Sequence, residues 1–333
     1  MEITPARSPA RRPERSWFAA VARPETLLLV LVAAVVLRPH VADVFDRPAL
    51  QNFSTVFVAV CIQAMPFLVL GVVISGALVA FVSHDTVTRV VPKHPAIAVP
   101  VAGLAGAALP GCECSAVPIA GRLVAQGAPP AAALTFLLSS PAINPVVLVA
   151  TSVAFPNRPV MVVARFVASL VASIVVGLIW TRIGRDDWVS KARSVRPVRG
   201  SRLATLGDVA LHDFLHAGGY LVLGAITAAL LQTVVPRSVL DSIGSNAVVA
   251  VVALGVLAVV LAICSEADAF VATGLTQFSW TARLVFLTVG PMVDLKLIAL
   301  QVGTFGRPFA LRFAPLTFVV AVASASIVGW WLL

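Results

Sequence analysis

Long stretches without a charged residue constrain this chain most. Five of them contain no Asp, Glu, Lys or Arg, and each exceeds the roughly 20 residues that a helix needs to cross a bilayer. They lack the two-residue alternation of a transmembrane β-barrel. Because 59% of all residues are hydrophobic and 12% are charged, the sequence predicts an all-α integral membrane protein. The runs are Pro48–Ser83, Leu123–Asn157, Phe214–Pro236, Ser242–Ser265 and Phe313–Leu333.

The net charge of +9 is concentrated before the first apolar run and in residues 181–205. Lys and Arg clustered in selected loops mark the cytoplasmic side of a membrane protein, so nucleic acid is not needed to explain them. We therefore expect a protein of the cytoplasmic membrane with a cytoplasmic N-terminus. The predicted parts are a tail (1–25), a first membrane half (26–180), a basic cytoplasmic loop (181–205) and a second membrane half (206–333).

The apolar run that begins at Thr26 follows several arginines and could be read as a signal peptide. No small-residue cleavage site follows it before Pro48, so we expect a first transmembrane helix over 26–45. The four cysteines form no C-x-x-C pair, and all lie in or beside apolar segments. A disulfide framework is therefore not expected.

The two halves repeat one another at a nearly constant distance. "FLVLG" at 67–71 returns as "YLVLG" at 220–224, an offset of 153, and later matches lie 150 residues apart. Biased composition is the alternative explanation, but the spacing of 27 residues from Cys-Ser to Pro is the same in both halves. The later matches pair Cys114–Ser115 with Cys264–Ser265, Pro141 with Pro291, and Asn144 with Asp294.

The number of crossings determines the predicted topology. Between Pro95 and Pro156 the chain must make a single net crossing. We expect a re-entrant hairpin over 96–110 and 115–126, then a crossing over 129–155 that is broken at "SSPAINP". Three full crossings would also satisfy the count. The second half enters from the other side, which predicts about seven to nine membrane segments in two inverted repeats, each with a broken or re-entrant helix.

"CECS" and "CSEADAF" are the segments most able to carry chemistry. Thiols and carboxylates at a helix break can bind a soft or borderline cation, although buried cysteines also pack as small hydrophobic residues. Intramembrane carboxylates cost about 2.5–3.5 kcal/mol each, unless the turn lies solvated at the outer surface. The candidate substrate-binding residues here are Cys112, Glu113, Cys114, Ser115, Cys264, Ser265, Glu266 and Asp268, and the candidate metal ligands are Cys112, Cys114, Cys264, Glu266 and Asp268.

Two further breaks complete the predicted site. Asn144 lies in the doubly proline-broken "SSPAINP", and Asp294 lies in "GPMVDLK", where it can alternatively pair with Lys296. Arg165 is expected to snorkel to the membrane surface and Cys61 to pack. A second possible metal site, which a solvated helix end explains better, comprises Asp208, His212 and His216.

"GCECSAVPIAGRLVAQGAPPAAALTFLLSSPAINP", "CSEADAF" and "GPMVDLK" together resemble the bacterial predicted-permease family that includes the organoarsenical efflux permeases. The likeness runs from about residue 50 to the C-terminus. It implies a permease, with methylated trivalent arsenicals as candidate cargo and Cys112 and Cys114 as contacts. The acidic "CSEADAF" fits a hydrated or divalent cation better, which keeps transition metals such as zinc open.

The leading hypothesis is a secondary transporter, not an enzyme, that moves a soft metal ion or metalloid across the cytoplasmic membrane. No Walker-type motif occurs, so neither an intrinsic ATPase nor a cofactor is expected. The expected partners are the lipid bilayer, a small inorganic or organometallic substrate, and a further copy or an accessory subunit. The alternatives are a non-transporting subunit of a larger complex and an intramembrane thiol oxidoreductase.

Overall fold

The computed structural model describes residues 48–82, 94–109, 111–185, 201–234 and 247–333, with a few positions in the loops between them. The predicted N-terminal tail and first helix lie outside these residues, and the basic loop is described only in part. Residues 53–333 form one compact unit by their internal contacts. This unit contains every element described below, apart from the first residues of α3.

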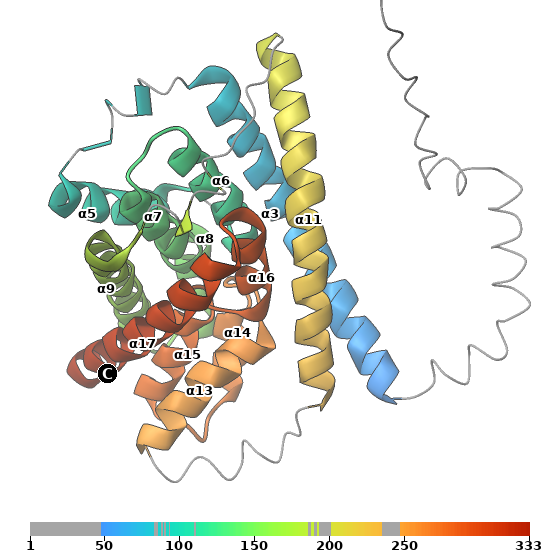
Figure 1. Cartoon of the computed structure of the whole chain (residues 1–333). Coiled ribbons are helices and arrows are strands. Elements are labelled where there is room, and N and C mark those ends of the chain that lie inside the picture. Colours follow the sequence, from blue (N-terminus) through green and yellow to red (C-terminus); the bar gives the residue numbers. More distant parts are fainter. Residues whose placement is uncertain are drawn as a thin grey trace, which may run out of the picture. The chain divides into compact units, whose positions relative to one another are not determined.

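Helices make up the described chain, in agreement with the all-α prediction (Figure 1). In the first half they are α3 (Pro48–Phe81), α5 (Pro95–Ala105), the 3-10 turn η1 (Gly106–Ala108), α6 (Glu113–Ala125), α7 (Pro130–Ile143), α8 (Pro145–Ala154) and α9 (Val160–Ile183). In the second half they are α11 (Arg202–Val234), α13 (Ala247–Leu261), α14 (Asp268–Gly274), α15 (Trp280–Val289), α16 (Leu295–Thr304) and α17 (Arg307–Leu332).

Each half begins and ends with a long helix, α3 and α9 in the first half and α11 and α17 in the second. Within the described residues, five helical segments are long and apolar enough to cross a membrane. The shorter apolar pieces lie between them. The long segments are Pro48–Phe81, Pro130–Ala154, Val160–Ile183, Arg202–Leu230 and Arg307–Leu332.

Packing repeats along with the order of the elements. α7 packs against α5 and α9, and α15 packs against α13 and α17 in the same way. Between the halves, α9 packs against α17, α6 against α16, and α8 against α14. Two short helices of the first half, α6 and α8, therefore contact two short helices of the second half, α16 and α14.

Proline and a polar cap produce the break between α7 and α8. Asn144 precedes Pro145, and the residue before a proline is disfavoured in helical conformation; its φ and ψ are −67° and 159°. The Asn144 side chain accepts from the Val147 amide at 3.0 Å and donates to the Gly111 carbonyl at 2.9 Å. It therefore begins α8 and also fixes the loop before α6.

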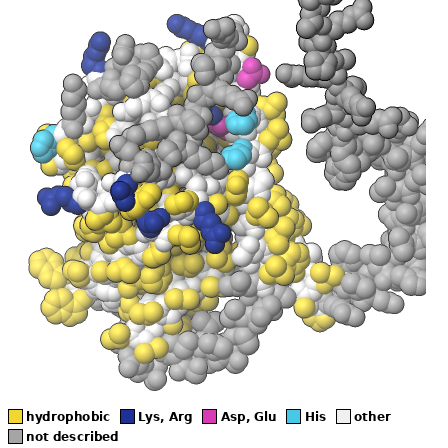
Figure 2. All heavy atoms as spheres, viewed as in Figure 1, with side chains coloured by type: hydrophobic (Ala, Val, Ile, Leu, Met, Phe, Trp, Pro, Cys, Tyr) yellow, Lys and Arg dark blue, Asp and Glu magenta, His cyan; other side chains and the backbone are white. Residues whose placement is uncertain are grey.

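The surface agrees with a membrane environment. In the view of Figure 2, hydrophobic side chains cover much of the described face, and Lys and Arg side chains lie near its top and across its middle. Several large apolar side chains, such as Ile62, Val153 and Leu311, are more than half exposed. Apolar surface of this extent is expected of helices that face lipid.

Candidate functional site

The loop before α6 and the first turn of that helix place two thiols and a carboxylate together. Cys112 is the N-cap residue of α6, and its backbone is extended (φ −87°, ψ 179°). One ligand atom from each of Cys112, Glu113 and Cys114 lies within 4.8 Å of the other two, and all three residues are buried. Free N–H groups at a helix start favour the negative charge of Glu113 at this position.

A third thiol reaches this group from the second half. Cys264 is 2% exposed and lies in the segment that connects α13 to α14. Its thiol is a hydrogen-bonding neighbour of the Cys112 thiol, which also contacts Cys114. Two residues earlier, Ala262 has a φ of 46°, an uncommon conformation for a residue with a Cβ atom. A strained turn therefore brings Cys264 to the two cysteines of the first half.

Lys296, in the first turn of α16, lies among these groups and is fully buried. Its Nζ forms an ion pair with Glu113 Oε1. The same nitrogen lies 3.3 Å from Asp294 Oδ2 and 3.6 Å from Cys264 Sγ. The pairing of Asp294 with Lys296 that the sequence raised is therefore present, but it is shared with Glu113 of the other half.

A second buried ion pair also joins the halves. The two terminal guanidinium nitrogens of Arg165 on α9, Nη1 and Nη2, donate to Asp268 at 2.9 and 2.7 Å. Arg165 also donates to Thr151 Oγ1 at 2.8 Å and to the Ser265 carbonyl at 3.2 Å. The expectation that Arg165 snorkels is wrong, because its side chain is fully buried and bound to Asp268. The solvated-turn alternative for Asp268 is wrong for the same reason.

The acids of the two ion pairs occupy similar places in their helices. Glu113 is the first residue of α6 and Asp268 is the first residue of α14, which occupies the same place in the second half. Each pairs with a basic residue of the opposite half. The caps match as well, since Asp294 accepts from the Leu297 amide at 2.6 Å, as Asn144 does from the Val147 amide.

Negative charge exceeds positive charge in this cluster. Glu266 interacts electrostatically with Glu113, Lys296 and Arg165. Its two buried carboxylate oxygens have no hydrogen-bond partner within the described part of the chain. If all are ionised, the four acids Glu113, Glu266, Asp268 and Asp294 and the two bases Arg165 and Lys296 leave a formal charge of −2. Such an excess inside a membrane requires bound cations or protons.

The remaining candidates occupy different positions. Ser115 Oγ donates to the Cys112 carbonyl at 2.8 Å and so supports the turn. Asp208, His212 and His216 are exposed on α11, where the ring of His216 contacts the Gly303 carbonyl at 3.1 Å. The sequence did not identify Arg165 and Lys296 as members of the site. The sequence did contain one signal that could have found these two bases: four acids inside a membrane need positively charged partners.

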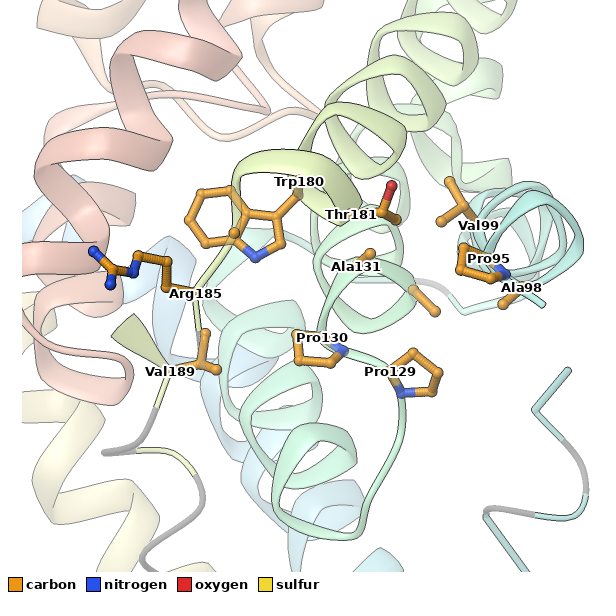
Figure 3. Close-up of a pocket in the computed structure, with 12 residues that line it drawn as sticks. Pro95, Ala98, Val99, Pro129, Pro130, Ala131, Trp180, Thr181, Arg185 and Val189 are labelled. Carbon is orange, nitrogen blue, oxygen red and sulfur yellow. The ribbon is translucent and has the colours of Figure 1, made fainter. Parts of the chain in front are cut away.

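A cavity of about 200 Å³ lies elsewhere, at the N-terminal ends of α5 and α7 and the C-terminal end of α9 (Figure 3). Prolines, alanines and valines supply most of its lining, with the indole of Trp180 and the side chain of Arg185 beside them (Figure 3). None of its lining residues belongs to the cysteine and carboxylate cluster. The buried thiols and carboxylates of the cluster therefore lie outside this cavity.

Comparison with known proteins assigns the chain to a family. The model of a family described as "Predicted permease" matches residues 49–330. UPF0718 protein YcgR of Bacillus subtilis is 36% identical over 281 residues, covering 82% of this chain and 95% of that protein. A Streptococcus mutans protein, whose name describes a predicted subunit of a two-component membrane permease complex, is 32% identical over 284 residues. This match covers 82% of this chain and 94% of that protein.

No solved structure matches the chain. The residues that the family model matches include every residue of the cluster. Together with the apolar helices, this match establishes a multi-pass membrane protein, and the chain belongs to this family of predicted permeases.

Proposed function

We propose that this permease moves a soft or borderline metal ion, or a metalloid such as an organoarsenical, through the buried cluster. The observation that carries the proposal is the meeting of three free, buried thiols from both halves, Cys112, Cys114 and Cys264, beside the carboxylate of Glu113. Thiolate donors select soft and borderline metals and thiophilic metalloids over hard ions.

The charge of the cluster supports a cationic cargo. A formal charge of −2 can be balanced by one divalent ion, with Glu266, Asp268 and Asp294 supplying charge near the thiols. Zinc satisfies both conditions because it accepts sulfur and oxygen ligands. A methylated trivalent arsenical would bind at most two of the three thiols, because one of its three bonds is to carbon, and would leave the carboxylates to hold protons.

Inverted repeats with alternating access provide the proposed route. The repeated order of helices, the reciprocal contacts of α6 with α16 and α8 with α14, and the paired caps support a shared midplane site. Basic residues lie at the end of α9 and at the starts of α11 and α17. They support a cytoplasmic location for these helix ends, and hence for the N-terminus. They are Arg182, Arg185, Arg202, Arg307 and Arg312.

Flux in vesicles tests the proposal. Purified protein in lipid vesicles would be assayed with zinc, cobalt, copper, arsenite and methylarsenite, first as wild type and then as the double variant Cys112→Ser, Cys114→Ser. We expect flux of at least one of these species, and a decrease of about tenfold or more in the variant, because hydroxyl groups are poor ligands for soft ions. Cys61→Ser is the matched control, since Cys61 lies in α3 outside the cluster.

Two outcomes would contradict the proposal in different ways. Full flux in the double variant would exclude a thiol site. Lack of flux for every species would favour the second candidate, a subunit that needs a partner protein. The name of the Streptococcus mutans relative, which describes a complex subunit, favours that candidate.

A further inference from the structure

The side chain of Lys296 occupies the place that a cation would take. Its Nζ is surrounded by Glu113, Asp294 and Cys264, two carboxylates and one thiol drawn from both halves. These are the donor types that a borderline metal ion uses. An ammonium group and a metal ion held by the same oxygen and sulfur atoms would repel each other and compete for these ligands.

We propose that Lys296 is a tethered cation that fills the empty site and is displaced by cargo. This inference rests on the proposed function, because it assigns a role within the same site. The ammonium remains charged throughout, so the competition is electrostatic. It neutralises Glu113 and Asp294 while the carrier is empty, and cargo takes over that role when it binds.

Only the end of the Lys296 side chain is free to make this movement. The backbone at Lys296 is fixed against α11, where Gly224 lies so close that an added Cβ would be 2.5 Å from Lys296 Cα. Four methylene groups separate that backbone from Nζ, which gives the ammonium a range of positions. The carboxylate oxygens of Glu266 accept no hydrogen bond from another residue of the described chain, and Glu266 interacts electrostatically with Lys296. We expect it to receive the displaced ammonium.

The other charged groups on neighbouring helices are bound to partners of their own, so the role of displaceable cation falls to Lys296. On α11, Asp213 pairs with Arg122, and the His216 ring contacts the Gly303 carbonyl. On α17, Arg312 donates to the Pro308 carbonyl and lies over Trp188. Arg165 is bound to Asp268 through two hydrogen bonds. Of the described basic residues, Lys296 is the one that pairs with Glu113, the acid between Cys112 and Cys114.

Zinc binding by the purified full chain tests the inference. We expect Lys296→Met to bind zinc about tenfold more tightly than wild type, because a competing positive charge is removed. Lys296→Arg is the matched control, since it keeps a positive charge and should show no gain. A variant that merely damaged the fold would bind more weakly, so a gain in affinity is specific to competition. Equal or weaker binding by folded Lys296→Met would overturn the inference.

A second pair of variants covers the case in which Lys296→Met does not fold. Adding Asp294→Asn removes one acid together with the base, and the double variant is compared with Asp294→Asn alone. The expected result is again about a tenfold gain on removing Lys296, and no gain overturns the inference.

The wild-type protein offers an independent measurement. The chain has three lysines, Lys93, Lys191 and Lys296, so the ammonium signals of lysine-labelled protein can be assigned by NMR. Saturating zinc should shift the Lys296 signal and leave the other two unchanged; an unmoved Lys296 signal would contradict displacement. If wild-type protein does not bind zinc, the displacement of Lys296 by zinc is excluded. The proposed transport function is tested separately, by the flux measured in vesicles.

Discussion

At the scale of single residues, the site depends on buried charges that balance across the two halves. Arg165 and Asp268 are 0% and 2% exposed, and two hydrogen bonds join them. Breaking a buried pair costs far more than the pair contributes relative to apolar residues, because one charge is left without a partner. The pair therefore gives a sharp test of whether these groups are buried in the folded protein.

Arg165→Met should lower the stability of the detergent-purified protein by about 3–5 kcal/mol, because Asp268 is left as an unpaired buried carboxylate. Thermal unfolding would measure the change. The double variant Arg165→Met, Asp268→Asn should recover most of the loss. Arg158→Met is the control, because Arg158 is exposed and only stacks on Trp280, a contact worth about 0.5–1 kcal/mol. Equal losses in the two arginine variants would contradict the burial of Arg165.

At the scale of helices, small residues let long and broken helices approach one another. Gly71 of α3 faces Ser115 of α6, and an added Cβ would overlap with the backbone there. Gly224 of α11 faces Lys296 of α16 in the corresponding way. These two glycines are the final residues of "FLVLG" and "YLVLG". Close approach through small residues is the usual means of packing membrane helices.

Gly224→Ala should destabilise the protein by about 1–3 kcal/mol, since the new methyl group would force α16 away from α11. Zinc affinity should fall as well, because the acidic side chain of Asp294, which caps α16, would move with that helix. Gly219→Ala is the control in the same helix: nothing lies within 4 Å of the added Cβ. Its stability should stay within about 0.5 kcal/mol or rise slightly, because alanine favours helix. Identical melting temperatures for the two variants would argue against the tight contact.

The sequence predicted the helix breaks better than the partners of the charged groups. "SSPAINP" and "PGCECS" locate the breaks through proline and glycine, which act on the local backbone. Pairing depends on which helices meet, and nothing local in the sequence joins Lys296 to Glu113 or Arg165 to Asp268. The general cost of intramembrane charge implied that partners exist, but a sequence cannot show which of several acids each base contacts.

At the scale of the whole molecule, the account rests on one site built by two related halves. Cys112 and Cys114 come from the first half and Cys264 from the second, and the two ion pairs cross the same boundary. A site of this kind can open to either side when the halves move relative to each other. If the second half supplied no ligand, the repeat would have no role in binding.

X-ray absorption spectroscopy on zinc-loaded protein tests this claim most directly, because it counts the sulfur atoms around the metal. The account predicts three sulfur neighbours in wild type and two in each of the single variants Cys112→Ser and Cys264→Ser, with Cys61→Ser unchanged. The loss in Cys264→Ser is the decisive result, since that cysteine belongs to the second half. An unchanged sulfur count in Cys264→Ser would contradict a site shared between the halves.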